Sequence, residues 1–174
     1  QNPLVDISTD LEKPPAFAHP VYSFRVDKGS EYLGEKYRIA RDFTSAQAVR
    51  QKKQLPGLRP IEVFGAPKDI FPLVVKAVRE RWPEWTIVRT ENSSFHLEAQ
   101  AESTIFHLID DIALQASPTT APGGTKIDIR IRRRHGPSDF GAGLKRLEEL
   151  RLLIQVAAAP IHRVEAQKRE AQAA

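Results

Sequence analysis

The segment IDIRIRRRHGPSDFG, from Ile127 to Gly141, limits most strongly what this chain can fold into. In an extended strand, successive side chains point to opposite faces of the sheet, so this segment divides into an apolar face and a basic face. The apolar face carries Ile127, Ile129 and Ile131, and the basic face carries Arg130, Arg132 and Arg134. The Gly-Pro-Ser-Asp run that follows supplies a turn, and Asp139 is placed to start a helix.

The chain after residue 57 predicts the order strand, helix, four strands, helix. A short strand at 60–64 precedes a helix that Pro67 or Asp69 opens, with Asp69 the preferred N-cap, and that Trp82-Pro83 ends. Strand patterns follow at 85–89, 95–100, 111–116 and from Ile127, and a long helix begins near Gly141.

This order predicts an α+β fold in which two helices cover one face of an antiparallel sheet. The order β-α-β-β-β-β-α resembles the TATA-binding-protein-like arrangement, which is an analogy of fold and not of activity. The isoleucine face is expected to pack under the helices. The opposite face is then expected to be wide, polar and open to solvent.

Residues 1–57 are expected to form an extended arm that contains one short helix, because prolines are dense and apolar residues sparse. Thr44 or Ser45 caps that helix. The arm is expected to lie over the domain, residues 58–159, through four aromatic side chains, Phe17, Tyr22, Phe24 and Phe43. Residues 160–174 follow as a polar helical tail after Pro160, which must kink or restart the last helix.

The composition is that of a water-soluble protein with a small basic excess. Lysines and arginines number 26 against 22 aspartates and glutamates, for a net charge of +4. The chain has no cysteine, which excludes disulfides and thiolate chemistry, and no apolar run nears the roughly 18 residues of a membrane span. Because the chain starts at Gln1 and contains no methionine, we expect a trimmed chain and an extracytoplasmic location, periplasmic or secreted.

Several blocks of the sequence together resemble a known family. They are Leu55-Pro56-Gly57-Leu58-Arg59-Pro60, Phe106-His107-Leu108-Ile109-Asp110-Asp111, Asp128-Ile129-Arg130, Arg134-His135-Gly136-Pro137-Ser138-Asp139-Phe140-Gly141 and Arg146-Leu147, with an arm from Asp6 to Phe17. The chain resembles the domain of unknown function 1499 family, which is bacterial and often exported. The resemblance implies a fold and a compartment, and it implies no reaction.

Charged residues near the basic strand form the candidate site: Arg130, Arg132 and Arg134 with Asp110, Asp111 and Asp139. Arginines beside carboxylates can bind an anion through paired hydrogen bonds. The same residues can instead form a structural network, the favoured interpretation of this cluster, in which Asp139 caps the last helix and Asp110 or Asp111 pairs with an arginine of the neighbouring strand. Both interpretations stay open at this point.

Other chemistry is less well supported by the sequence. Nucleic acid is an unlikely ligand because the basic face lacks aromatic stacking positions. His96, His107 and His135 lack the spacing of a metal site, and no cofactor motif or catalytic set occurs.

We therefore expect a non-catalytic binding domain that presents the arginines to a small anion or an acidic protein surface. The alternatives are an enzyme that uses Asp110 and Asp111 as acid and base, and a structural component of an envelope assembly.

Overall fold

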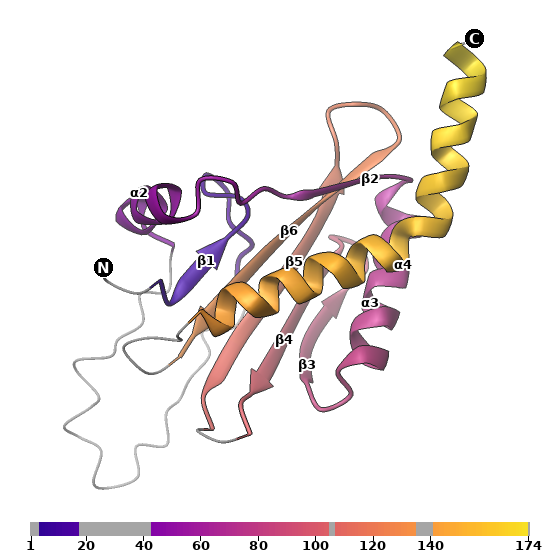
Figure 1. The fold of residues 1–174 in the computed structure, drawn as a ribbon. Coiled ribbons are helices and arrows are strands. Elements are labelled where there is room, and N and C mark those ends of the chain that lie inside the picture. Colours follow the sequence, from indigo (N-terminus) through magenta and orange to yellow (C-terminus); the bar gives the residue numbers. More distant parts are fainter. Residues whose placement is uncertain (1–3, 18–42, 105–106, 135–140, 174) are drawn as a thin grey trace, which may run out of the picture.

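A computed structural model describes residues 4–17, 43–104, 107–134 and 141–173 (Figure 1). Over these residues the chain forms a six-stranded antiparallel sheet and three helices. In chain order the elements are β1 (Asp6–Ser8), α2 (Ser45–Gln54), β2 (Ile61–Phe64), α3 (Pro67–Arg81), β3 (Thr86–Glu91), β4 (His96–Glu102), β5 (Ile109–Pro118), β6 (Gly124–Arg133) and α4 (Ala142–Ala173). The predicted α+β fold and the order from β2 to α4 are confirmed.

Strand β6 organises the sheet because it is paired along both of its edges. One edge pairs with β5, and β4 and β3 follow outward from there. The other edge is shared, since β2 pairs with its first half and β1 with its second half. Thr9 fills the position between them: its N–H donates to the carbonyl of Ile129 at 3.0 Å, and its Oγ1 accepts from the N–H of Ile129 at 2.9 Å.

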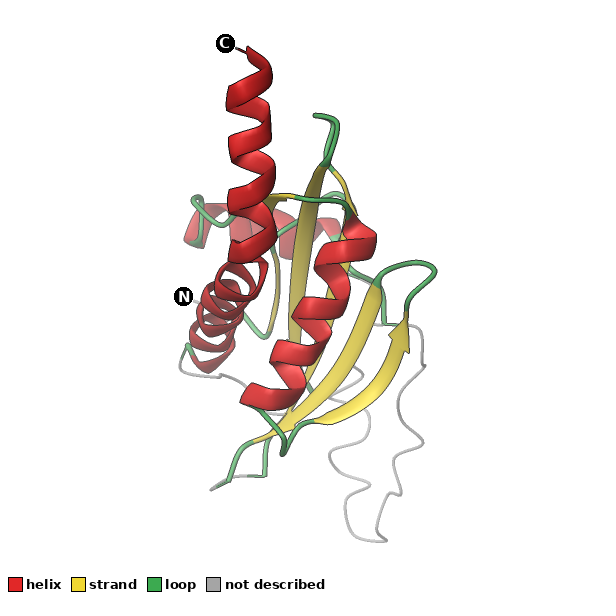
Figure 2. Ribbon diagram, turned by 90° about the vertical axis from the view of Figure 1, so that its right-hand side faces the viewer, coloured by secondary structure: helices red, strands yellow, loops and turns green. Residues whose placement is uncertain are grey.

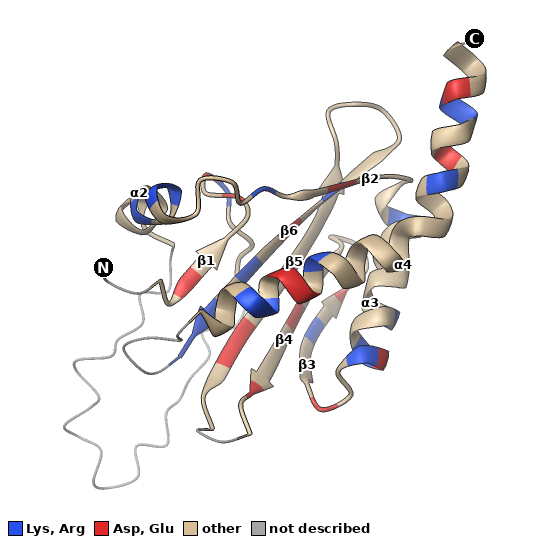
Figure 3. Cartoon of the chain, in the orientation of Figure 1, with Lys and Arg blue, Asp and Glu red and all other residues tan. Residues whose placement is uncertain are grey.

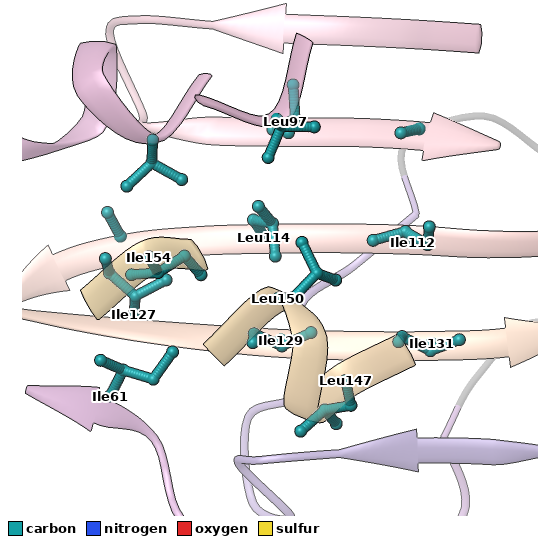
Figure 4. Close-up of a cluster of buried hydrophobic side chains, with 14 of the residues drawn as sticks. Ile61, Leu97, Ile112, Leu114, Ile127, Ile129, Ile131, Leu147, Leu150 and Ile154 are labelled. Carbon is teal, nitrogen blue, oxygen red and sulfur yellow. The ribbon is translucent and has the colours of Figure 1, made fainter. Parts of the chain in front are cut away.

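Helices α3 and α4 cover the same face of the sheet (Figure 2). The strands present alternate side chains to this face, as the period of two in a pleated strand requires. Figure 4 shows Leu147, Leu150 and Ile154 of α4 over the isoleucines of β6. All six of these side chains are buried, so the predicted apolar face of the Ile127 strand is confirmed.

Prolines stand at the start of helix α3 and inside helix α4. Helix α3 begins at Pro67 with Ala66 as its N-cap, so the preferred N-cap at Asp69 was wrong. Proline fits the first helical position because its missing N–H would have no intrahelical acceptor there. Helix α4 continues through Pro160, and Figure 1 shows it cross the sheet and then change direction before it projects beyond the strands.

The N-terminal arm is partly built into the sheet. Thr44 caps α2 with a capping box, as the sequence predicts. Strand β1 was not predicted, and its free edge is covered by the buried amide of Gln51. That amide accepts from the N–H of Ser8 at 2.8 Å and donates to its carbonyl at 2.6 Å, so α2 supplies the hydrogen bonds that a neighbouring strand would make.

Two leucines of α4 test which face of the helix holds the fold. Leu150 is fully buried over the sheet, whereas Leu152 is 64% exposed on the outer side. We expect Leu150→Ala to lower the free energy of unfolding by about 2–5 kcal/mol, through lost burial and a cavity. The matched change Leu152→Ala is expected to stay within about 0.5 kcal/mol of the parent in urea denaturation. Equal losses in the two variants would contradict the packing described.

Candidate functional site

The three predicted arginines lie on one face of the sheet, opposite α3 and α4. Arg130 and Arg132 alternate along β6 with buried isoleucines, and Arg134 follows the strand. The register of β6 with β5 places Asp111 opposite Arg132, and its register with β1 places Asp6 there from the other edge. We call this side of the sheet, with Arg130, Arg132 and Arg134 at its centre, the arginine face.

The expectation that this face is open to solvent is wrong. Arg130, Arg132 and Arg134 are only 3%, 5% and 9% exposed. Part of the cover comes from the arm, since the ring of Phe17 lies 4.9 Å from the Arg130 guanidinium carbon and 4.4 Å from that of Arg132. Phe43 lies 5.5 Å from the Arg130 guanidinium carbon. Flat guanidinium groups stack well on aromatic rings, so these contacts let the arm exclude water from the charges.

Each of the three guanidinium nitrogens of Arg130 has a hydrogen-bond partner. Its Nε and Nη2 donate to the two carboxylate oxygens of Asp6 at 3.0 and 2.8 Å, and its Nη1 donates to the carbonyl of Pro15 at 3.2 Å. A bidentate pair of this kind is the strong form of an ion pair, and burial requires it because a lone buried charge is costly. The arm therefore supplies the counter-charge as well as the cover.

Arg134 has a similar partner in the adjacent strand. Its Nη2 donates to one oxygen of Asp111 at 2.8 Å, and its Nε lies 3.1 and 3.2 Å from the two oxygens. Asp111 is itself buried. The predicted pairing of Asp111 with an arginine of the neighbouring strand is confirmed, and its partner is the residue that follows β6.

Arg132 differs from Arg130 and Arg134 in its hydrogen-bond partners. Its Nη2 lies 3.5 Å from Asp111, too far for a good hydrogen bond, and its buried Nε has no hydrogen-bond partner in the described part of the chain. Arg132 also stacks under the ring of Phe17. In Arg130 and Arg134 the edge formed by Nε and Nη2 faces a carboxylate. The same edge of Arg132 has no carboxylate bound bidentately to it.

Asp110 does not share a site with Asp111. The two are consecutive in β5, so their side chains leave opposite faces of the sheet. Asp110 accepts from Nε and Nη2 of Arg133 at 2.8 and 3.1 Å, and also from Nη1 of Arg146 in the first turns of α4. Figure 3 shows acidic and basic positions close together in the region where β6 ends and α4 begins.

The acid–base pair that the enzymatic alternative requires is therefore not formed. Each of the two aspartates forms ion pairs with arginines on its own face of the sheet. Arg146 lies 5.8 Å from the ring of Trp85, which stacks on Trp82, so the Asp110 cluster belongs to the packing of α4 against the sheet. Burial lowers the pKa of Arg146.

A second polar group lies further along β6. Asp128 accepts from Thr9 Oγ1 at 2.9 Å and forms an ion pair with Lys126 at 3.0 Å, and Lys126 also pairs with Asp10 at 3.2 Å. Burial raises the pKa of Asp128, and the bonds from Lys126 and Thr9 offset this only in part. This group ties the arm to the sheet next to Arg130.

His96 and Glu98 form a buried pair on the same side of the sheet, at β4. His96 Nε2 lies 3.1 Å from Glu98 Oε1, and its Nδ1 lies 2.9 Å from Gln115 Oε1. Gln115 is oriented by its own donation to the carbonyls of Ser94 and Ala116. Both imidazole nitrogens therefore face acceptors. Burial lowers the pKa of His96, but the hydrogen bonds to Glu98 and Gln115 outweigh it and the pKa is raised.

The remaining predicted residues fall into two groups. Asp139 and His135 lie outside the described residues, as do Tyr22 and Phe24 of the arm. His107 is exposed and lies 2.7 Å from Glu102. Within the described part of the chain, no group of three or more metal-ligating side chains occurs, and no helix is both long and apolar enough to cross a membrane.

The acidic partner of Arg130 was not predicted from the sequence. Asp6 stands in a three-residue strand, too short for alternation to be recognised, and its partner is 124 residues away. The signal that was available is the pattern Asp6-Ile7-Ser8, in which a polar residue flanks an apolar one on each side. Ile7 is buried in the core, so the pattern does reflect a strand whose apolar side chain points to the helix-covered face and whose polar side chains point to the other face.

A family model described as "Protein of unknown function (DUF1499)" matches residues 6–154. The chain belongs to the DUF1499 family. The resemblance seen in the sequence is thereby confirmed, and the match begins at Asp6, so β1 and the arm that closes the arginine face are part of the DUF1499 domain. No curated protein matches the chain.

Among the solved structures that are similar to part of this DUF1499 protein is the adenylate sensor from AMP-activated protein kinase in complex with 5-aminoimidazole-4-carboxamide 1-beta-D-ribofuranotide, at 17% identity and a TM-score of 0.37. The similarity covers 56% of this chain and 92% of that chain. A likeness at this level carries no argument about fold or ligand.

The bond between Asp6 and Arg130 can be tested by removing the charge of Asp6. Asp6→Asn leaves a buried guanidinium without its counter-charge, so we expect the free energy of unfolding to fall by about 3–5 kcal/mol. Glu12→Gln, an exposed change on the same arm, is the control and is expected to cost less than about 0.5 kcal/mol. A loss in Asp6→Asn no larger than in the control, measured by urea denaturation, would show that the ion pair is unimportant.

The His96 pair predicts a dependence of stability on pH. Because the folded-state pKa of His96 is raised above its ordinary value of 6.5, its contribution is full below that value and is lost as pH rises through the folded pKa. Glu98 favours the charged form and Arg89 opposes it. We expect the stability difference between the parent and His96→Gln to be larger at about pH 5.5 than at about pH 8.5.

Urea denaturation at the two pH values measures this difference, with Glu98→Gln as a second variant that removes the partner carboxylate. A difference that stays constant with pH, or grows as pH rises, would exclude the protonated pair.

Proposed function

We propose that this DUF1499 domain is a non-catalytic binding domain whose ligand is an anion held on the arginine face beneath the N-terminal arm. A binding role is favoured over catalysis because Asp110 and Asp111, the pair that the enzymatic alternative requires, lie on opposite faces of the sheet and each bind an arginine. The proposal keeps the arginines named from the sequence and replaces the open face by a covered one. Within the site, Arg132 binds the anion. The ion pairs Arg130–Asp6 and Arg134–Asp111 hold the residues on either side of Arg132 in place.

The observation that carries the proposal is the state of Arg132. A buried guanidinium normally has its donors satisfied, and an unpaired donor of this kind costs on the order of 1–3 kcal/mol. Arg132 is buried, its Nε has no partner, and its nearest carboxylate oxygen stands 3.5 Å from Nη2. An anion in contact with Arg132 would remove that cost, which gives the ligand its binding energy.

The burial of the site supports a small ligand over an acidic protein surface. A protein partner could reach Arg132 only if the arm left the sheet, and the arm is held by β1, by Thr9 and by Asp6. A small anion needs only local movement at Phe17. An extracytoplasmic location is part of this proposal, and the resemblance to often-exported proteins supports it.

A structural role in a larger assembly is the second candidate function, and one observation favours it. Helix α4 presents Leu152 and Val156, one turn apart and each 64% exposed, on the side away from the sheet. An exposed apolar row of this kind suits contact with another surface. Measurement of the oligomeric state after Leu152→Glu and Val156→Glu separates this role from anion binding, which these changes should leave intact.

Anion binding can be tested by thermal unfolding in matched sodium salts. We expect acetate, phosphate or sulfate to raise the melting temperature above that in sodium chloride of equal ionic strength, by the stabilisation that binding to the folded state provides, about 2.7 kcal/mol at a hundredfold excess over Kd. Arg132→Gln should abolish this increase, and Arg50→Gln, on the exposed side of α2, should preserve it.

Because the readout is the change that the salt causes, a lower starting stability of Arg132→Gln does not imitate the result. An increase of the same size in Arg132→Gln, or no increase in the parent with any of the three anions, would refute the proposed function.

A further inference from the structure

The buried arginines of this domain share one way of binding a carboxylate. Arg130, Arg133 and Arg134 each direct the same side of the guanidinium group, Nε and Nη2, at an aspartate, with closest distances of 2.8 Å. The three pairs lie on both faces of the sheet, so the arrangement does not depend on one local environment. Arg132 stands between them on β6 with that same side lacking a bidentate partner.

We infer that the Nε/Nη2 edge of Arg132 is a binding site for the carboxylate group of a small monocarboxylic acid. This inference rests on the proposed function and narrows it to a class of ligand. The bound carboxylate would lie in the plane of the guanidinium, as the carboxylate of Asp6 does on Arg130. Its two oxygens would accept from Nε and Nη2, which supplies the hydrogen bond that Nε lacks.

The faces and the edge of Arg132 set the shape that fits. The ring of Phe17 lies over the guanidinium at 4.4 Å, so a ligand cannot stack on that side of it. Asp111 lies 3.5 Å from Nη2 and is engaged by Arg134, so it does not fill the edge. An approach in the plane leaves Phe17 where it is, and there a flat group with two oxygens matches two parallel N–H donors.

The charge and the number of oxygens favour a carboxylate over a phosphate. Arg132 carries one positive charge, which a carboxylate balances, whereas phosphate near neutral pH carries between one and two negative charges. A phosphate also has oxygens beyond the two that the edge can satisfy. Neighbouring donors are engaged, since Arg130 bonds Asp6 and Pro15, so those oxygens would be buried without partners at a substantial cost.

The test is calorimetric titration of the full chain with acetate, propionate and inorganic phosphate, at one pH and one ionic strength. We expect both carboxylates to bind Arg132 and phosphate to bind at least about tenfold more weakly. Arg132→Lys keeps the charge and removes the two-donor edge, so it should weaken acetate binding by about tenfold to a hundredfold. Arg50→Lys, on exposed α2, should bind acetate like the parent.

The outcomes separate this inference from the proposed function. If Arg132→Lys binds acetate as tightly as the parent, or phosphate binds as tightly as acetate, anion binding stands and the carboxylate site is wrong. If none of the three anions binds the parent, both are wrong. Should Arg132→Lys fail to fold, the comparison of acetate with phosphate on the parent protein still decides the ligand class.

Discussion

Burying a guanidinium group is costly unless a carboxylate accompanies it, and this requirement shapes the structure around β6. Arg130 lies under the arm because Asp6 arrives with β1 and binds both of its side-on donors. The register of β1 on β6 places Asp6 opposite Arg132 and Ser8 opposite Arg130. Without Asp6 the arm would cover an uncompensated charge. The pairing of these two residues therefore links the first strand of the chain to the last.

The two faces of β6 are buried by different physical means. Apolar side chains of α3 and α4 cover the isoleucines, where the favourable term is the removal of apolar surface from water. Carboxylates, aromatic rings and the arm cover the arginines, where each polar group needs a partner of its own. A polar layer made in this way specifies geometry closely, because each buried donor requires an acceptor in a set position. Among the arginines of this face, Arg132 has a buried Nε without a hydrogen-bond partner in the described part of the chain.

The sequence predicted the elements well where one strand or helix carries its own pattern. Alternation in β6 identified both the isoleucine face and the arginine face, and Trp82-Pro83 marked the end of α3. The sequence pattern predicts an open arginine face, and this prediction is wrong. The cover comes from residues such as Asp6 and Phe17, which lie more than 110 positions away in the chain. The enzymatic alternative treats Asp110 and Asp111 as a pair because they are adjacent in sequence, although strand geometry sends their side chains to opposite faces. Contacts over such distances leave no periodic signal in a single sequence.

The most direct measurement of the central claim is a spectrum of the arginine Nε–H groups by ¹⁵N–¹H NMR in the ligand-free protein. Groups bound to carboxylates should exchange slowly with water and resonate downfield, as expected for Arg130 and Arg134. The Arg132 signal should be protected by burial but lie upfield of both, and it alone should move downfield when acetate is added. Rapid exchange of all three groups, or an Arg132 signal that already matches its neighbours without ligand, would contradict the account.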